Sequence, residues 1–110
     1  MLSIKRNLLS GTLDMLILRT LVGGPLHGYA VAKAIQEAGR GILRIEQGSL
    51  YPALRKAEGR GWLQSAWGVT HTKRRARIYE LTPSGRQQLG ADEAAWTRFA
   101  DAVARVLAQV

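Results

Sequence analysis

The chain has 110 residues, a formal net charge of +8, 46% hydrophobic residues and no cysteine. This length suits one small domain, and the lack of cysteine excludes disulfides and thiolate metal sites and agrees with a reducing cytoplasm. The N-terminus lacks the apolar region of a signal peptide, and no apolar run reaches the length of a membrane span, so we expect a cytoplasmic protein with no membrane partner.

Two helices are predicted in the N-terminal third. The first begins at Ser10 and is stopped by Gly23, Gly24 and Pro25. Its core face is formed by Leu13, Leu16, Ile17 and Leu21. The second runs from about Gly28 to Ala38, and Gly39 is expected to end it in a left-handed conformation. Residues 2 to 9 are expected to form a helical arm that covers apolar surface of its own chain or of a second copy.

The stretch from Gln47 to Gly61 is predicted to contain a helix that reads DNA. Ser49 suits its N-cap, and Pro52 would occupy the third helical position, whose N–H has no partner within the helix. An apolar stripe of Leu50, Leu54 and Ala57 would face the core, while Tyr51, Arg55 and Lys56 lie off that stripe. The same pattern also fits an ordinary surface helix with solvated cations, and the helix alone does not decide between these interpretations.

The segment before this helix, Ile42 to Ile45, is either a brief strand or a connection. After the helix, the aromatic and branched residues of Trp62 to Trp67 and of Ala76 to Leu81 predict two strands. The link between them carries three consecutive cations, Lys73, Arg74 and Arg75, and Arg77 follows. These cations could merely protect a hairpin edge from aggregation. Directly after a candidate recognition helix, however, we favour a basic wing, which predicts a mainly α fold with a small β-hairpin: a winged helix-turn-helix.

The positive charge is concentrated in this region. From Arg40 to Arg77 there are nine Lys or Arg against two acidic residues, which is nearly the whole excess of the chain. A basic zone of this kind is typical of nucleic-acid binding, because each cation placed on a phosphate releases a condensed counterion. The cations do not line one face of a single long helix, so a membrane surface is the weaker partner.

The C-terminal segment is predicted as one long helix, with Thr82 as N-cap and Pro83 at its first position. Its apolar residues follow the spacing of a coiled-coil seam: Trp96, Phe99, Val103, Val106 and Val110. The pattern continues back to Leu89 but is broken by Asp92. A helix with this much apolar surface is covered economically by a second copy, although it could also fold back on its own chain. We therefore assign residues 1–81 to a DNA-binding domain with an N-terminal helical arm, and residues 82–110 to a dimerisation helix.

Several motifs resemble those of PadR-type transcriptional regulators. They are Leu9-Ser-Gly-Thr-Leu-Asp-Met-Leu-Ile-Leu, Leu26-His-Gly-Tyr, Glu46-Gln-Gly-Ser-Leu-Tyr-Pro-Ala-Leu and Arg74-Arg-Ala-Arg-Ile-Tyr-Glu-Leu-Thr-Pro-Ser-Gly. The resemblance covers about residues 8 to 90 and implies a winged-helix homodimer that represses transcription from an inverted repeat. It also implies dimerisation through the C-terminal helix and, in many members, release from DNA by a small effector. The single helix after the hairpin is similar to that of the short subfamily.

The resemblance also implies which residues hold double-stranded DNA. Family members use the Tyr of the His-Gly-Tyr motif, the Ser, Tyr and Pro of the third helix, and basic wing residues. In this chain these are Tyr29, Ser49, Tyr51, Pro52, Lys73, Arg74, Arg75 and Arg77, to which we add Gln47, Arg55 and Lys56 from the third helix. Hydroxyl groups and cations of this kind can reach phosphates or base edges. Tyr29 could instead belong to the core.

A ligand can be argued at Trp96 alone, because some family members hold flat aromatic compounds between two such tryptophans at the dimer centre. Packed core is the alternative for Trp96. Enzyme chemistry finds little support, since His27 and His71 lie far apart with no cysteine or close carboxylate pair, and we expect no cofactor and no metal. The rival functions are non-specific coating of DNA and a winged helix used for protein contact.

Overall fold

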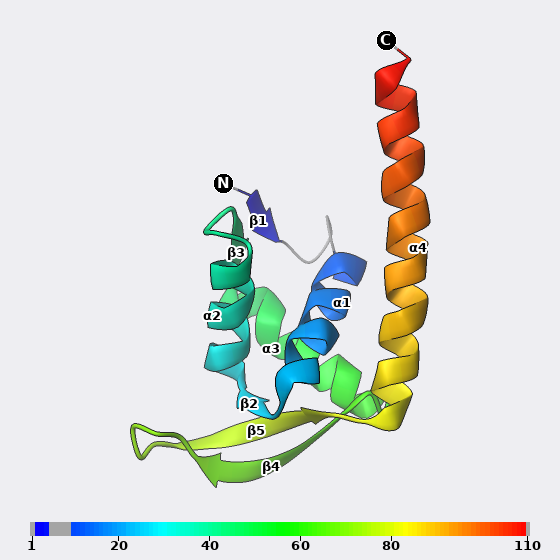
Figure 1. Ribbon diagram of the computed structural model, residues 1–110. Coiled ribbons are helices and arrows are strands. Elements are labelled where there is room, and N and C mark those ends of the chain that lie inside the picture. Colours follow the sequence, from blue (N-terminus) through cyan, green and yellow to red (C-terminus); the bar gives the residue numbers. More distant parts are fainter. Residues whose placement is uncertain (1, 5–9, 110) are drawn as a thin grey trace.

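The computed structural model describes residues 2–4 and 10–109. Its helices are α1 (Ser10–Thr20), α2 (Gly28–Ala38), α3 (Gln47–Gly59) and α4 (Pro83–Ala108), and a 3-10 turn, η1 (Leu21–Gly23), follows α1. Its strands are β1 (Leu2–Ile4), β2 (Leu26–His27), β3 (Leu43–Ile45), β4 (Leu63–Val69) and β5 (Arg75–Leu81). The first three helices pack together on one side of the β4–β5 hairpin, and α4 runs away from it (Figure 1). The predicted mainly helical winged fold is confirmed.

The hairpin belongs to an antiparallel sheet with the strand order β2-β5-β4. The prediction included β4 and β5 but missed β2, whose Leu26 pairs with Tyr79 of β5. This pairing is too short to leave a pattern in the sequence, yet it anchors the start of α2 to the base of the hairpin. As a result, the hairpin is held in a fixed position relative to the helices.

The N-terminal segment is a strand where its structure is described, so the prediction of a helical arm was wrong there. Strand β1 pairs in parallel with β3, with Leu2 opposite Leu43 and Ile4 opposite Ile45. A lone three-residue strand leaves its backbone N–H and C=O groups without hydrogen-bond partners. Strand β1 supplies such partners to β3. The remainder of the proposed arm, residues 5–9, lies outside the described residues.

Helix α1 lies at the centre of the core, between α2, α3 and α4. The predicted core positions Leu13, Ile17 and Leu21 are buried, and Leu16 is partly buried against the same cluster. The other helices and the sheet contribute the rest of this cluster, chiefly Val31, Ile35, Leu50, Leu54, Ala57, Leu63 and Tyr79. The core is therefore built around the helix that the sequence identified as structural.

Helix α3 begins earlier than predicted. Its first residue is Gln47, and the residue at the N-cap position is Glu46, whose carbonyl oxygen accepts from the backbone N–H groups of Ser49 and Leu50. Ser49 is therefore not the N-cap, and Pro52 lies inside the helix rather than at its third position. The prediction relied on the usual preference of proline for the first turn. Packing of Leu50 and Leu54 into the core stabilises the longer helix.

The turn after α2 also differs from its prediction. Gly39 has a φ of −82°, so it does not take the left-handed conformation expected of it. Arg40 and Gly41 take that conformation instead, with φ values of 54° and 75°. A backbone bond from the N–H of Gly39 to the Ile35 oxygen keeps this residue in the last turn of the helix. The left-handed conformation that reverses the chain direction therefore begins one residue later than predicted, at Arg40.

The start of α4 is attached firmly to the segment that joins α3 to β4, and its N-cap is the predicted one. The Thr82 hydroxyl accepts from the Gly85 N–H at 3.0 Å and donates to the carbonyl oxygens of Gly61 and Trp62. Leu89, predicted to belong to the dimerisation seam, is only 4% exposed and packs into the core of its own chain. The first turns of α4 therefore belong to the packed unit.

A substitution at Gly85 is expected to be severely destabilising. An added Cβ would lie 2.2 Å from the backbone oxygen of Trp62, and a backbone atom cannot move aside as a side chain can. We expect Gly85→Ala to lower the free energy of unfolding by about 3 kcal/mol or more, in the range of other overpacked sites. Chemical denaturation measures this change. Gly90→Ala is the matched control, because a Cβ there meets nothing within 4 Å, and it should instead stabilise α4 by up to about 1 kcal/mol.

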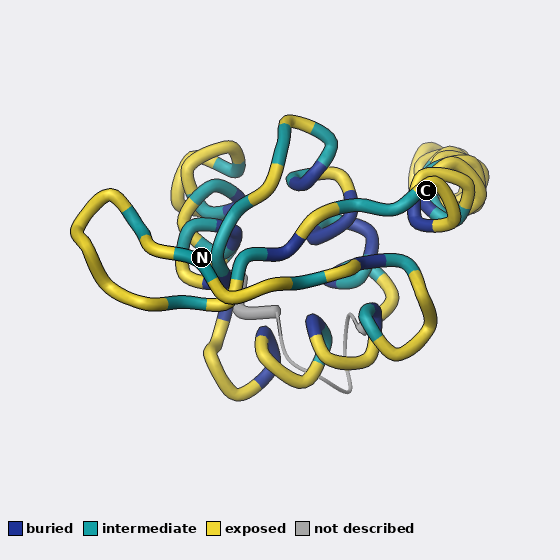
Figure 2. The backbone as a smooth tube through the Cα atoms, turned by 90° about the horizontal axis from the view of Figure 1, so that it is seen from below, coloured by how far each residue is buried: buried dark blue, intermediate teal, exposed yellow. Residues whose placement is uncertain are grey.

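The outer part of α4 extends beyond the core. Its apolar residues Trp96, Phe99, Val103 and Val106 are between 40% and 66% exposed. Figure 2 shows most of α4 and the far end of the hairpin as exposed chain. The last predicted seam residue, Val110, lies outside the described residues.

Among residues 2–4 and 10–109, no helix combines the length and the apolar character that a membrane span requires.

Candidate nucleic-acid interface

Helix α3 turns one side to the core and the other to solvent. Leu50, Leu54 and Ala57 are buried, as the apolar stripe predicted. The exposed side carries most of the predicted DNA contacts, namely Gln47, Tyr51, Pro52 and Arg55. A helix that presents polar, aromatic and cationic groups on one uninterrupted side can enter a major groove.

Two of the predicted contacts on α3 are placed differently. Ser49 is 8% exposed, because the earlier start of the helix turns this residue toward the core. The Lys56 ammonium group lies 2.7 Å from a carboxylate oxygen of Asp14 in α1, so its charge is already compensated within the chain. Ser49 is therefore largely covered, whereas the Lys56 side chain remains 41% exposed and is oriented by its ion pair with Asp14.

The wing is the turn between β4 and β5 together with the first residues of β5, as far as Arg77. In its backbone, the Thr70 N–H donates to the Arg74 oxygen and the Lys73 N–H donates to the Thr70 oxygen, and the Thr70 hydroxyl accepts from the Arg74 N–H at 3.2 Å. Lys73 has a φ of 63°, a left-handed conformation at the tip of the turn. The side chains of Lys73, Arg74, Arg75 and Arg77 are exposed, as predicted for a basic wing.

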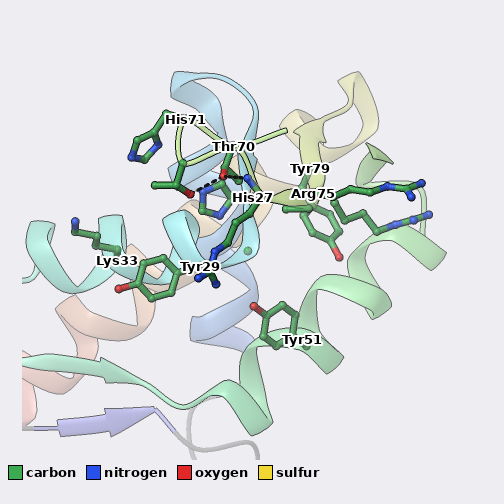
Figure 3. Close-up of a pocket in the computed structure, with 13 residues that line it drawn as sticks. His27, Tyr29, Lys33, Tyr51, Thr70, His71, Arg75 and Tyr79 are labelled. Atoms are coloured by element: carbon green, nitrogen blue, oxygen red, sulfur yellow. Dashed lines mark hydrogen bonds between the residues drawn. The ribbon is translucent and has the colours of Figure 1, made fainter. Parts of the chain in front are cut away.

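A groove of about 750 Å³ lies between the wing and the starts of α2 and α3. Tyrosines from three elements line it, Tyr29 from α2, Tyr51 from α3 and Tyr79 from β5, together with cations of the wing (Figure 3). Gly28 allows α2 and α3 to meet here, because a Cβ at this position would lie 2.9 Å from the Tyr51 ring. The groove therefore joins the exposed side of α3 to the basic wing.

Tyr29, at the start of α2, lines this groove and does not belong to the core. It is 63% exposed, which excludes the core interpretation. The ring of His27 stacks beside the Tyr29 ring, with centroids 6.4 Å apart, and its Nδ1 accepts from the Ala30 N–H. Because Nδ1 is occupied in this way, Nε2 of His27 carries the proton and can donate. Sequence reasoning missed this donor, although the motif His-Gly-Tyr before a helix marked its position.

Tyr79 forms the floor of the groove. Its side chain is 8% exposed, and burial, reinforced by the nearby Glu58 carboxylate, raises the pKa of its hydroxyl above the usual 10.0. The group therefore stays neutral at any pH at which the protein works, and it remains a hydrogen-bond donor. The positive charge of the site comes from the arginine and lysine side chains around it.

Trp67 in β4 is the main residue of this surface that sequence reasoning missed. Its side chain is 60% exposed, and the guanidinium groups of Arg75 and Arg77 both lie over its ring. The strand register places Trp67 directly opposite Arg77. Only that register could have indicated the contact, because the residues are ten positions apart in the printed sequence.

Among the described residues, no group of His, Cys, Asp or Glu side chains could hold a metal ion.

Comparisons with known proteins agree with this geometry. The chain is similar to a transcriptional regulator from Clostridium thermocellum, with a TM-score of 0.81 and 26% identity over 90% of this chain and 96% of that one. It is also similar to a PadR family transcriptional regulator from Eggerthella lenta, with a TM-score of 0.75 and 36% identity over 88% of this chain and 82% of that one.

Relatives with similar sequences indicate the same class. The transcriptional regulator Rv3488 of Mycobacterium tuberculosis is 36% identical over 84 residues, which make up 76% of this chain and 75% of the relative. An uncharacterised 37.1 kDa protein in a transposon of Streptomyces fradiae is 36% identical over 90 residues, but the chain spans only 24% of its length. The model of the transcriptional regulator PadR-like family matches residues 17–91. The chain therefore belongs to the PadR-like family of transcriptional regulators.

Proposed function

We propose that the chain is a sequence-specific repressor that binds double-stranded DNA as a homodimer. The observation that carries this proposal is the groove between α3 and the wing, which is lined by Tyr29, Tyr51 and the wing cations Arg74, Arg75 and Arg77. A duplex on this surface would receive the exposed side of α3 in its major groove, and the wing cations would reach the flanking phosphates. Residues 1–81 would serve as the DNA-binding part.

Pairing of two copies through residues 82–110 is supported by the exposed side of α4. Trp96, Phe99, Val103 and Val106 are spaced as a coiled-coil seam and remain between 40% and 66% exposed among the described residues. A symmetric pair presents two recognition helices, which suit the half-sites of an inverted repeat in successive major grooves. Repression of transcription in the cytoplasm follows from the family resemblance, since a dimer on promoter DNA excludes polymerase.

A planar aromatic effector is the proposed regulator of this dimer. Trp96 is 44% exposed, and its ring lies 6.1 Å from that of Phe99 on the same helix. Across a two-fold axis, the Trp96 rings of both copies could stack a flat guest between them. Packed core within the dimer is the competing role for Trp96.

Fluorescence anisotropy tests the proposal. The protein is titrated onto the DNA upstream of its own gene and onto a shuffled duplex, at low and at near-physiological salt. We expect a preference of about a thousandfold or more for one duplex that persists at the higher salt. Equal binding that vanishes with salt would indicate DNA coating, and no binding would indicate a protein-contact module. Repeating the titration with planar aromatic compounds, on wild type and Trp96→Phe, tests the effector.

A further inference from the structure

Two arginines of the wing share one aromatic ring. The guanidinium carbon of Arg75 lies 4.9 Å from the centroid of the Trp67 ring, and that of Arg77 lies 5.3 Å from it. Both distances lie within the range at which the negative potential of an aromatic face attracts a cation. The indole therefore restricts where each guanidinium group can lie.

Arg77 is also held by a chain of two hydrogen bonds that connects it to the recognition helix, α3. Its Nε donates to the Ser65 hydroxyl at 2.9 Å, and this hydroxyl donates to the Glu58 carboxylate at 2.5 Å. Glu58 belongs to α3, Ser65 to β4 and Arg77 to β5. The chain of bonds therefore runs from the recognition helix across both strands of the hairpin and orients one guanidinium group.

This arrangement leaves the terminal nitrogens of both guanidinium groups available. Arg75 and Arg77 remain exposed although their positions are constrained by the ring, and the bond to Ser65 uses only the Nε of Arg77. A guanidinium group that is held in place suits a backbone phosphate, since it can donate more than one N–H to phosphate oxygens. Constraint before binding also reduces the side-chain entropy that binding would otherwise remove.

We propose that Trp67 is a positioning residue of the DNA interface, which holds Arg75 and Arg77 in place as a site for backbone phosphate. The Glu58–Ser65–Arg77 chain ties this site to α3, so that the helix and the wing meet the duplex at a fixed separation. The inference rests on the proposed DNA binding of the groove, and it assigns to Trp67 a role that acts through the two arginines.

The test compares DNA affinity for Trp67→Leu, for Arg75→Gln with Arg77→Gln, and for the three changes together, each over a series of salt concentrations. We expect Trp67→Leu to weaken binding about tenfold with an unchanged salt slope, because the cations are still present but no longer oriented. The double arginine variant should lose affinity and salt slope together. Adding Trp67→Leu to it should change nothing further. Trp67→Phe, which keeps an aromatic ring, should recover most of the loss.

Arg60→Gln is the matched control, since Arg60 also lies over a tryptophan, 5.2 Å from the Trp62 ring, but near the end of α3 and away from the wing. It should leave affinity almost unchanged. A tenfold loss on adding Trp67→Leu to the double arginine variant would mean that Trp67 contacts DNA itself and would overturn the inference. Full affinity in Trp67→Leu would overturn it as well. If wild type bound no duplex, the proposed function would fail together with the inference.

A measurement without DNA tests the positioning separately. In the NMR spectrum of the free protein, the Nε–H signal of Arg77 should be shifted by the Trp67 ring current and protected from solvent exchange by its bond to Ser65. Trp67→Leu should remove the shift. Ser65→Ala should remove the protection. A signal at the position of a freely moving arginine in wild type would contradict the proposed arrangement.

Discussion

Neutralising the tip of the wing is expected to weaken DNA binding by about a hundredfold or more at low salt and to flatten its salt dependence. The variant combines Lys73→Asn, Arg74→Gln and Arg75→Gln, which removes three exposed cations from each copy. Each lost phosphate contact should reduce the slope of log affinity against log salt by about one unit. Because phosphate contacts carry no sequence information, the loss should be similar on every duplex. Anisotropy titrations over a salt series measure both quantities.

The substitutions are chosen to leave the turn intact. Lys73 has a φ of 63°, which asparagine tolerates better than alanine does. Glutamine keeps most of the length of the arginine side chains. The control variant replaces Arg60, Arg98 and Arg105 by Gln and lowers the net charge equally, at positions away from the wing. A wing variant with the salt slope of wild type, or a control that loses as much slope, would contradict the assigned role of the wing.

Elements marked by local signals were predicted closely. Helix α2 has the predicted bounds, Gly28–Ala38, because glycine and polar residues flank a short amphipathic run. Thr82 caps α4, with Pro83 behind it, through the expected bond to the Gly85 N–H. In both cases the residues that form the boundary lie within one turn of each other, so their effect is visible in the printed sequence.

Features that depend on distant contacts were not predictable in the same way. The start of α3 at Gln47 follows from packing against the core, which overrode the preference of Pro52 for a first turn. The strand at residues 2–4 forms because β3 offers a parallel partner. Leu89 fits the seam by its spacing, but the attachment of α4 turns this position into its own chain.

In the candidate interface too, features marked by local signals were predictable, and features that depend on distant contacts were not. Residue types predicted its cations, Tyr29 and Tyr51, and the exposed fraction of Tyr29 then excluded the core for that residue. The sequence could not indicate that the Asp14 carboxylate of α1 forms an ion pair with Lys56. Nor could it indicate that the guanidinium groups of two arginines lie over the Trp67 ring. Such pairings require the packing of α1 on α3 and the register of β4 on β5, which are properties of the folded chain.

A charge placed in the exposed seam of α4 is expected to abolish dimerisation and, with it, high-affinity DNA binding. Phe99 is 61% exposed in its own chain and lies at the centre of the seam between Trp96 and Val103. Burial of one phenylalanine contributes about 1.5–3 kcal/mol, and a homodimer loses two such side chains in Phe99→Glu. The expected loss of about 3–6 kcal/mol raises the dimer dissociation constant by about two to four orders of magnitude, before the repulsion of two facing carboxylates is added.

Thr97→Glu is the matched control, because Thr97 is exposed on the same turn of α4 but lies off the seam. Sedimentation velocity should find Phe99→Glu monomeric at micromolar concentration and Thr97→Glu dimeric, with both variants equally helical by circular dichroism. The monomer should bind a duplex with a single half-site as weakly as wild type does, since its groove between α3 and the wing is intact. It should no longer gain affinity from the second half-site, which a dimer engages without a further loss of translational freedom. A monomeric wild type, or a Phe99→Glu variant that remains dimeric, would show that this face of α4 does not join two copies.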